Sequence, residues 1–278
     1  MNWAGSLRGE ISHWARQYAK RHDIPHYLSL GQSPTVMFEP YNGNTLHGNF
    51  LAPSYKAILD HQRWRSRLKK PHPRRSKALP AGKGSQVKEL DSSNSSDALL
   101  MNVFCYPKIE KRRALARLFG QSAPPLPEFG VPGHVPRVGG KRDTEIDMRL
   151  GGILIEAKLT EPDFTKKSKA HVETSYRDFK EVFEASALPQ SDDKYFNYQL
   201  IRYVLAAFAH DATFFLICDA RRPDLLRSWW DVMRSIKPLA LRSRCHFVLW
   251  QEIAAAAPDE VREFLREKYG IAITWHGA

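Results

Sequence analysis

The spacing of apolar residues divides the chain into helical and extended segments. Between residues 6 and 21, apolar side chains recur three and four positions apart, which is the period of an amphipathic helix. Helical patterns also predict helices over 53–68, from about 97, and over 171–187, 195–210, 224–236 and 258–269. Apolar runs predict strands over 144–150, 153–159, 213–218 and 245–250. Helices and strands therefore alternate in the second part of the chain.

Turn-forming residues separate these segments and suggest how the chain is organised. Gly151 and Gly152 stand between two predicted strands, which is a strong signal for a β-hairpin. The stretch 71–85 is rich in proline and glycine and has the composition of a linker or loop. We therefore expect an N-terminal helical accessory region over 1–88 and a layered α/β domain over 89–278.

Basic residues are concentrated in one stretch. The chain has 42 Lys and Arg against 30 Asp and Glu, a net charge of +12, and no acidic residue lies between Asp60 and Glu89. Ten basic side chains in this basic stripe (61–88) account for most of the excess, as expected of a polyanion binder. A solvated loop that only aids solubility is the alternative. The predicted DNA-binding residues are Arg63, Arg65, Arg67, Lys69, Lys70, Arg74, Arg75 and Lys77.

Composition excludes several classes of protein. The three cysteines are too few and too scattered for a disulfide framework or an all-cysteine zinc site, and they suit a reducing compartment. No apolar run approaches the length of a membrane-spanning helix, and the first residues lack the apolar core of a signal peptide. We therefore expect a cytoplasmic protein that does not engage a membrane.

The chemistry-bearing segment begins at Asp147 and ends at Lys158. Alternate residues of a strand share a face, so Glu156 and Lys158 point the same way, and the hairpin turns Asp147 back towards them. Ionic groups beside the apolar run 153–155 cost free energy unless they are paired or bind a metal. Asp147, Glu156 and the carbonyl oxygen of Ala157 are hard ligands that suit Mg²⁺, with Mn²⁺ as a substitute. Lys158 can orient or deprotonate a water that attacks a phosphodiester.

The pattern Asp147…Glu156-Ala157-Lys158 resembles the PD-(D/E)XK nuclease superfamily, which has the restriction-endonuclease-like fold. Gln199 and Tyr203, four residues apart on a predicted helix, resemble the Gln-x-x-x-Tyr element of RecB-type members. The resemblance implies a central mixed β-sheet flanked by helices, with Asp147, Glu156 and Lys158 catalytic and with Gln199 and Tyr203 supporting the site. Ile146 stands where the superfamily motif has proline.

A third acidic metal ligand is not fixed by the motif. In the superfamily it often lies on the first helix of the core, and the candidates here are Glu110, Glu89 and Asp97. Glu145 shares a strand face with Asp147 and is a further candidate, and Glu161 is a weaker one.

These patterns predict a Mg²⁺-dependent DNA endonuclease of a bacterial restriction or defence type. Cutting both strands needs two sites, so a homodimer is expected. One alternative is a repair or recombination nuclease that acts on ends, flaps or junctions. Another is a nucleic-acid-binding protein that has the same fold but does not cut.

Overall fold

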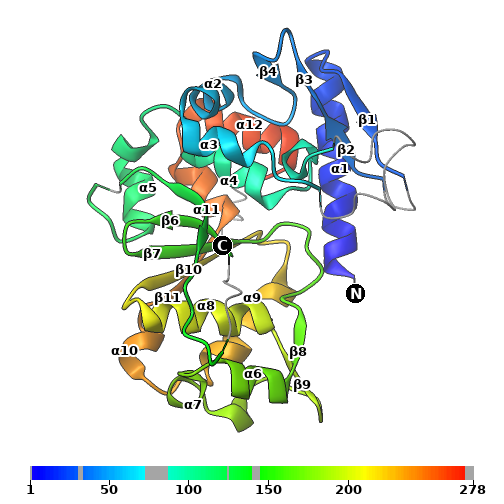
Figure 1. The fold of residues 1–278 in the computed structure, drawn as a ribbon. Helices are drawn as coiled ribbons and strands as arrows, with labels where there is room; N and C mark the ends of the chain where they lie inside the picture. Colours follow the sequence, from blue (N-terminus) through cyan, green and yellow to red (C-terminus); the bar gives the residue numbers. More distant parts are fainter. Residues whose placement is uncertain (1, 31–33, 73–86, 124, 140–144, 273–278) are drawn as a thin grey trace, which may run out of the picture. The chain divides into compact units, whose positions relative to one another are not determined.

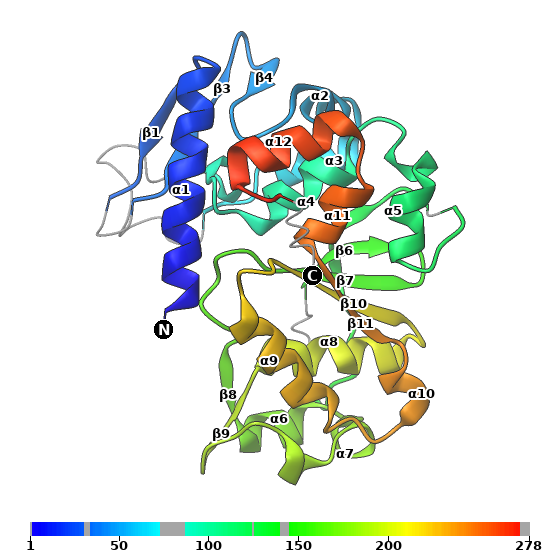
Figure 2. The ribbon, with the colours of Figure 1, turned by 180° about the vertical axis from the view of Figure 1, so that it is seen from behind.

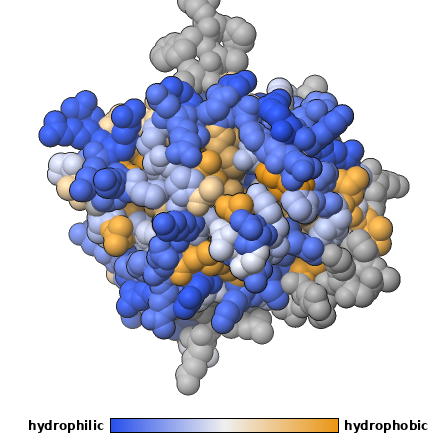
Figure 3. Space-filling model, turned by 90° about the horizontal axis from the view of Figure 1, so that it is seen from above, coloured by the Kyte–Doolittle hydropathy of each residue, from blue (hydrophilic) through white to orange (hydrophobic). Residues whose placement is uncertain are grey.

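The computed structural model describes residues 2–30, 34–72, 87–123, 125–139 and 145–272. The chain forms two compact units, each built from separate stretches of sequence. Unit 1 comprises 1–127, 157–160 and 249–278, and unit 2 comprises 128–156 and 161–248. Within the part of the chain that is described, no helix combines the length and apolar character needed to cross a membrane. Figure 3 shows one face, where hydrophilic residues dominate and hydrophobic ones form small separate groups.

Unit 1 is built mainly of helices. Its longest helix, α1 (Trp3–Arg21), lies beside α12 (Asp259–Tyr269) in both ribbon views (Figures 1 and 2). The other helices are α2 (Ala52–Asp60), α3 (Gln62–Arg67), α4 (Ser96–Phe104), α5 (Arg113–Leu118) and α11 (Trp250–Ala256), with 3₁₀ turns at Glu89–Asp91 and Ile109–Lys111. Two small hairpins pair β1 (His26–Leu28) with β2 (Val36–Phe38) and β3 (Pro40–Tyr41) with β4 (Leu46–His47).

The helix α1 shows how the apolar pattern shapes unit 1. Leu7, Ile11, Ala15 and Ala19 recur every four residues and are all buried, so one face of the helix joins the core. The side chain of Asn2 accepts a hydrogen bond from the Gly5 amide at 2.9 Å and caps the first turn. The predicted N-terminal helix is therefore confirmed.

Unit 2 is built around a five-stranded mixed sheet in the order β11-β10-β7-β6-β5 (Figure 1). The strands are β5 (Glu128–Pro132), β6 (Glu145–Leu150), β7 (Ile153–Ala157), β10 (Thr213–Cys218) and β11 (Cys245–Leu249). Its helices are α6 (Lys169–Ser175), α7 (Phe179–Val182), α8 (Tyr198–Ala209), α9 (Pro223–Met233) and α10 (Leu239–Arg242), with a 3₁₀ turn at Ala185–Ala187. A hairpin pairs β8 (Lys166–Ser168) with β9 (Lys194–Phe196). The helix α8 packs on β10 and on α9.

The predicted hairpin at the centre of the sheet is confirmed. β6 and β7 are antiparallel, and Leu150 pairs with Ile153 across the two-residue turn. Gly151 has a φ of +57°, in the left-handed region that glycine adopts without the steric cost of a Cβ. The strand predicted at 213–218 coincides with β10, and the one at 245–250 coincides with β11 to within one residue.

Two predicted helices differ from the structure. The helix expected over 171–187 is wrong, since α6, α7 and a 3₁₀ turn occupy this stretch and extended residues interrupt it. Tyr176 and Phe183 are those extended residues, and each forms a β-bridge with a distant segment, to Arg137 and Ile236 respectively. The helix expected over 53–68 is divided, because His61 has an extended conformation between α2 and α3.

The compact units differ from the functional division expected from the sequence. Unit 1 contains the N-terminal region 1–88, and it also takes in α4, α5, α11 and α12. The division into an accessory region and a catalytic domain at residues 88 and 89 stays a prediction.

Candidate active site

Two predicted carboxylates lie at neighbouring positions on the hairpin of unit 2. The ladder between β6 and β7 pairs Met148 with Ile155, so the next position outward places Asp147 opposite Glu156. Residues opposite one another in an antiparallel pair share a face of the sheet, with Cβ atoms about 4.5–5.5 Å apart. Glu156 is 2% exposed, whereas Asp147 is half-buried. The hairpin therefore brings together two acids that are nine residues apart in the sequence.

Tyr203 on α8 lies beside both acids. Burial raises the pKa of Tyr203 well above its usual value, and the charges of Glu156 and Asp147 raise it further. The Tyr203 hydroxyl donates a hydrogen bond to the backbone carbonyl of Glu145 at 2.9 Å. The tyrosine therefore stays protonated and ties α8 to the strand that carries Asp147.

The ring of Tyr203 is fixed by an aromatic stack from two other elements. It stacks on Phe214 of β10 with a centroid separation of 5.3 Å and an interplanar angle of 6°. Phe214 in turn contacts Trp229 of α9 at 5.5 Å, and all three side chains are buried. This packing holds the hydroxyl in one place, because a buried ring in a dense core has few alternative positions.

Gln199 lies one turn before Tyr203 on the same face of α8. Its backbone amide donates to the carbonyl of Phe164 at 2.9 Å, which fixes the first turn of the helix. Asn197 precedes that turn in a left-handed conformation, with a φ of +57°. The side chain of Gln199 is half-buried. The spacing predicted from the sequence is thus realised on one helix.

The chain passes from unit 2 to unit 1 directly after Glu156, so Ala157 and Lys158 belong to unit 1. Both residues are buried, at 1% and 5% exposure. In unit 1 the indole Nε1 of Trp250 donates to the carbonyl oxygen of Lys158 at 3.1 Å. The backbone immediately after the acidic strand is thereby fixed by a buried hydrogen bond.

The candidates for a third acid lie in different surroundings. Asp97 accepts hydrogen bonds from Arg67 at 2.6 Å and from Lys70 at 2.8 Å, and Glu89 pairs with Lys70 at 3.0 Å. These ion pairs occupy both carboxylates within unit 1. Glu110 lies in a 3₁₀ turn of unit 1, and Glu145 is exposed on β6 in unit 2. Glu145 is therefore the candidate that shares a strand with Asp147.

The basic stripe is heterogeneous in the structure. Arg63, Arg65 and Lys69 are exposed on or just after α3, which is anchored by the buried Trp64. The Nε1 of Trp64 donates to the carbonyl of Pro127 at 2.9 Å. Arg67 and Lys70 instead form the ion pairs with Asp97. Three predicted DNA-binding residues lie outside the described residues: Arg74, Arg75 and Lys77.

The oxygen donors at the hairpin suit Mg²⁺. Mg²⁺ commonly takes one or two carboxylates from a protein and keeps several waters, and Asp147 and Glu156 supply two. Among the described residues, no group of three or more His, Cys, Asp and Glu side chains is arranged to hold a metal. Carboxylate oxygens are hard donors, which suit Mg²⁺ better than the thiolate and imidazole ligands typical of a structural zinc site do.

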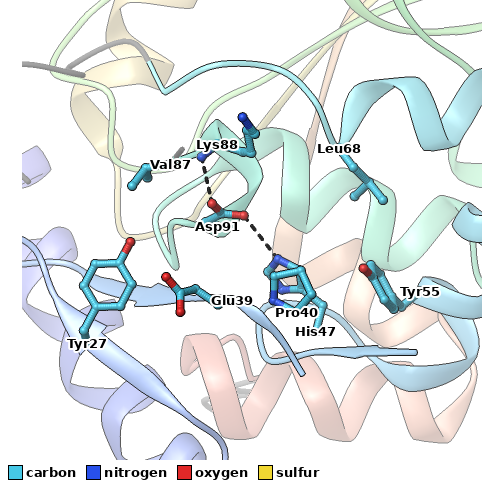
Figure 4. Close-up of a pocket in the computed structure, with 9 residues that line it drawn as sticks. All are labelled: Tyr27, Glu39, Pro40, His47, Tyr55, Leu68, Val87, Lys88 and Asp91. Atoms are coloured by element: carbon cyan, nitrogen blue, oxygen red, sulfur yellow. Dashed lines mark hydrogen bonds and ion pairs between the residues drawn. The ribbon is translucent and has the colours of Figure 1, made fainter. Parts of the chain in front are cut away.

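A separate cavity of about 490 Å³ lies in unit 1 (Figure 4). His47 donates from Nε2 to Asp91 at 3.2 Å while its Nδ1 accepts the Asn49 amide at 3.1 Å, so both ring nitrogens are engaged. Burial lowers the pKa of His47, so the ring is neutral and has no nitrogen available as a general base. The sequence analysis did not predict this cavity, because its lining comes from separated segments: Tyr27, Glu39, Pro40, His47, Tyr55, Leu68, Val87, Lys88 and Asp91.

Sequence analysis also missed a group of basic side chains around two tyrosines of unit 2. Arg137 contacts the hydroxyl groups of Tyr176 and Tyr198, and Arg202 lies over the Tyr198 ring with its Cζ 5.1 Å from the centroid. The signal available in the sequence was the short run that contains Lys166, Lys167 and Lys169.

The mixed sheet flanked by helices is the architecture that the sequence resemblance implied. A family model described as "Restriction Endonuclease associating with ARP" matches residues 8–270. The match covers nearly all of the chain, which therefore belongs to this family. The family is one of restriction-type nucleases, and such a nuclease implies DNA as its substrate. No curated protein and no solved structure shows a significant match to the chain.

Proposed function

We propose that the protein is a Mg²⁺-dependent DNA endonuclease of the PD-(D/E)XK type that cuts DNA in bacterial defence. The observation that supports the proposal is the hairpin register: Met148 pairs with Ile155, and the next position along the same register is Asp147 opposite Glu156, whose charges both act on Tyr203. Membership of the restriction-endonuclease family supports the same reading. The biological setting and the cytoplasmic location are parts of the proposal.

Each residue of the site has a distinct task. Asp147, Glu156 and the carbonyl oxygen of Ala157 would hold the metal, and Lys158 would orient or deprotonate the attacking water. Tyr203 and Gln199 are positioning residues, because α8 carries both and Tyr203 is hydrogen-bonded to the β6 backbone. When bound, Mg²⁺ supplies a Lewis acid that stabilises charge on the phosphate and lowers the pKa of a water.

The experiment compares cleavage of DNA by the wild type, Glu156→Gln and Lys158→Ala, with Mg²⁺ or with Mn²⁺. Glu128→Gln on β5 and Lys180→Ala on α7 are controls that make the same chemical changes at positions of unit 2 outside the proposed site. We expect both site variants to lose at least about 100-fold in rate, the scale of one acid–base or charge-stabilising group. Both controls are expected to cut normally. Full activity in a folded Glu156→Gln variant would contradict the proposal.

The choice of DNA separates the proposal from a nuclease that acts on ends, flaps or junctions. The Gln199 and Tyr203 pair on α8 is the observation that favours this second candidate. Covalently closed plasmid is cut only by an endonuclease, whereas an end-dependent enzyme cuts linear or flapped DNA alone. Binding to all of these substrates without cleavage of any would favour the non-cleaving alternative.

The family description also names a partner, since its members associate with ARP. We propose that this chain forms the same association and that the nuclease acts as a homodimer on duplex DNA. Sedimentation of the chain alone, with DNA and with ARP tests both associations. Cleavage assays in the presence of ARP then show whether the partner is needed for activity.

A further inference from the structure

Three basic side chains gather around the first turns of α8 in unit 2. Arg202 on α8 and Lys167 on β8 both lie over the ring of Tyr198, at 5.1 Å from Cζ and 6.0 Å from Nζ to the ring centroid. Arg137 reaches the Tyr198 hydroxyl at 3.5 Å. We call Arg137, Lys167 and Arg202 the α8 cationic patch.

A pair of tyrosines fixes the central arginine of this patch. The hydroxyl groups of Tyr176 and Tyr198 are 2.7 Å apart, and the Arg137 guanidinium donates to the Tyr176 hydroxyl. The guanidinium also lies over the Tyr176 ring, with Cζ 4.6 Å from the centroid. A hydrogen bond and a cation–π contact together hold Arg137 in one orientation, which reduces the entropy lost when it binds a ligand.

The positive charge of the patch has no carboxylate paired to it among the described residues. Within the described ranges, none of the three side chains forms an ion pair with a carboxylate, and all three are partly exposed. Burial and the nearby charges of Lys167 and Arg137 lower the pKa of the neighbouring His171, so this ring does not add to the charge. Three positive groups clustered at a partly open surface indicate a place for an anion.

The patch adjoins the candidate active site through α8. Tyr198 and Arg202 are four residues apart and share one face of α8. Gln199 and Tyr203 are also four residues apart and share the adjacent face of the same helix. Tyr203 lies beside Asp147 and Glu156, as described above. One rigid helix therefore connects the cationic patch to the two carboxylates, and both belong to unit 2.

We propose that the α8 cationic patch binds phosphate groups of a DNA strand and so places the strand at the carboxylates of the hairpin. This inference rests on the proposed function, because it takes DNA as the substrate. Arg137 and Arg202 offer planar guanidinium groups that match phosphate oxygens, and Lys167 adds a point charge. The phosphates belong either to the backbone or to a strand terminus, and the test separates these sources.

The test measures DNA affinity without divalent metal, by fluorescence anisotropy of a labelled duplex at several salt concentrations. The triple variant Arg137→Gln, Lys167→Gln and Arg202→Gln is compared with Lys180→Gln, Arg227→Gln and Arg234→Gln. The second triple removes the same charge from exposed positions of unit 2 outside the patch. We expect the patch triple to lose about tenfold or more in affinity and to lower the slope of log K against log salt by about 2–3.

Two additional measurements identify the source of the phosphate and guard against misfolding of the triple variant. A loss seen with both 5′-phosphorylated and 5′-hydroxyl duplexes identifies backbone phosphates, and a loss confined to the phosphorylated duplex identifies a terminal phosphate. The double variant Lys167→Gln and Arg202→Gln leaves the Arg137–tyrosine hydrogen bonds intact, so it tests the patch if the triple fails to fold. Equal affinity and salt slope in folded patch and control variants would overturn the inference. DNA binding that depends on the patch, in a wild type that cuts no DNA, would overturn the proposed function alone.

Discussion

Tyr203 shows how a single side chain joins the packing of unit 2 to its chemistry. Replacing it with Phe removes the hydrogen bond to the Glu145 carbonyl and keeps the stack on Phe214. We expect a loss of about 1 kcal/mol in the free energy of unfolding, the usual net value of one hydrogen bond. We also expect slower cleavage, because the hydroxyl lies beside Glu156 and Asp147. Urea denaturation and single-turnover cleavage measure the two effects.

Tyr195→Phe is the matched control for this change. The Tyr195 ring is also buried, and its hydroxyl donates to Glu173 at 2.6 Å on the β8–β9 side of unit 2. Both variants should lose similar stability, and only Tyr203→Phe should lose activity. If the two variants cut DNA equally fast, Tyr203 has only a structural role.

His47 makes stability depend on pH. Burial lowers its pKa in the folded state below the usual value of about 6.5, so the unfolded chain binds the proton more tightly. The free energy of unfolding is therefore expected to fall as the pH drops below about 6.5, and the contribution is complete above that value. Urea midpoints between pH 5 and pH 7.5 measure this slope.

His47→Gln keeps a hydrogen-bond donor towards Asp91 and removes the titrating group. Its stability should change less with pH than that of the wild type, while the exposed His13→Gln variant should keep the full slope. An unchanged slope in His47→Gln would assign the acid sensitivity to other groups. The half-buried His171 and the exposed His246 have lowered pKa values as well, so some slope is expected to remain.

At the residue scale, local patterns predicted the hairpin that carries the two acids and missed the patch. The strands that carry Asp147 and Glu156 are joined by a two-residue turn, so strand periodicity and turn chemistry were enough to predict their register. Arg137 and Tyr198 are 61 residues apart and meet only through the tertiary fold. No local pattern encodes such a meeting, which explains why the sequence predicted one group and not the other.

At the element scale, we predict that α3 contributes to DNA binding. Its exposed Arg63 and Arg65 stand on a helix anchored by Trp64, whereas Arg67 is paired with Asp97. We expect Arg63→Gln with Arg65→Gln to weaken DNA binding at low salt and to lower the salt slope by about 2. Anisotropy titrations at 50–200 mM salt measure the change.

The control for α3 is a pair of arginines on a helix with no predicted role. Arg262 and Arg266 on α12 pair with Asp259 and Glu263, and their replacement by Gln removes the same two charges. These control changes should leave the slope close to that of the wild type. If the two double variants change DNA affinity and its salt slope equally, Arg63 and Arg65 act only through the net charge of the protein.

The helices and strands that the sequence predicted correctly are those whose apolar pattern lies entirely within the element itself. α1 and α12 each have an amphipathic stripe, and β10 is a short apolar run, so periodicity and length identified them. The single helix predicted over 171–187 was wrong because Tyr176 and Phe183 take extended conformations and pair with distant residues. The two-residue strands β3 and β4 carry too little pattern to be detected.

At the scale of the whole chain, the two compact units are interleaved in the sequence. Unit 1 needs α11 and α12 from beyond residue 248, and α12 packs on α1 from the opposite end of the chain. Amino-acid composition marks the proline- and glycine-rich stretch near residue 80 as a linker. Composition is a local property, so it does not show which distant segments pack together. The chain leaves unit 2 and enters unit 1 near the end of β7, directly after Glu156.

This interleaving predicts different behaviour for two fragments. The fragment 128–248 contains all of unit 2, including its sheet and the buried Phe214 and Trp229, and should fold cooperatively by itself. The fragment 1–127 lacks α11 and α12, which leaves the apolar face of α1 without its partner, and should not fold. Circular dichroism and the dispersion of amide signals distinguish the two states.

A third fragment controls for the missing helices. Joining 249–278 to 1–127 through a flexible linker restores α12 beside α1 and should recover cooperative unfolding in unit 1. The Lys158 backbone that Trp250 bonds would still be absent, so the recovered unit should be less stable than unit 1 in the whole chain. Cooperative folding of 1–127 alone, with 128–248 unfolded, would show that the segments in each unit do not depend on one another as the structure indicates.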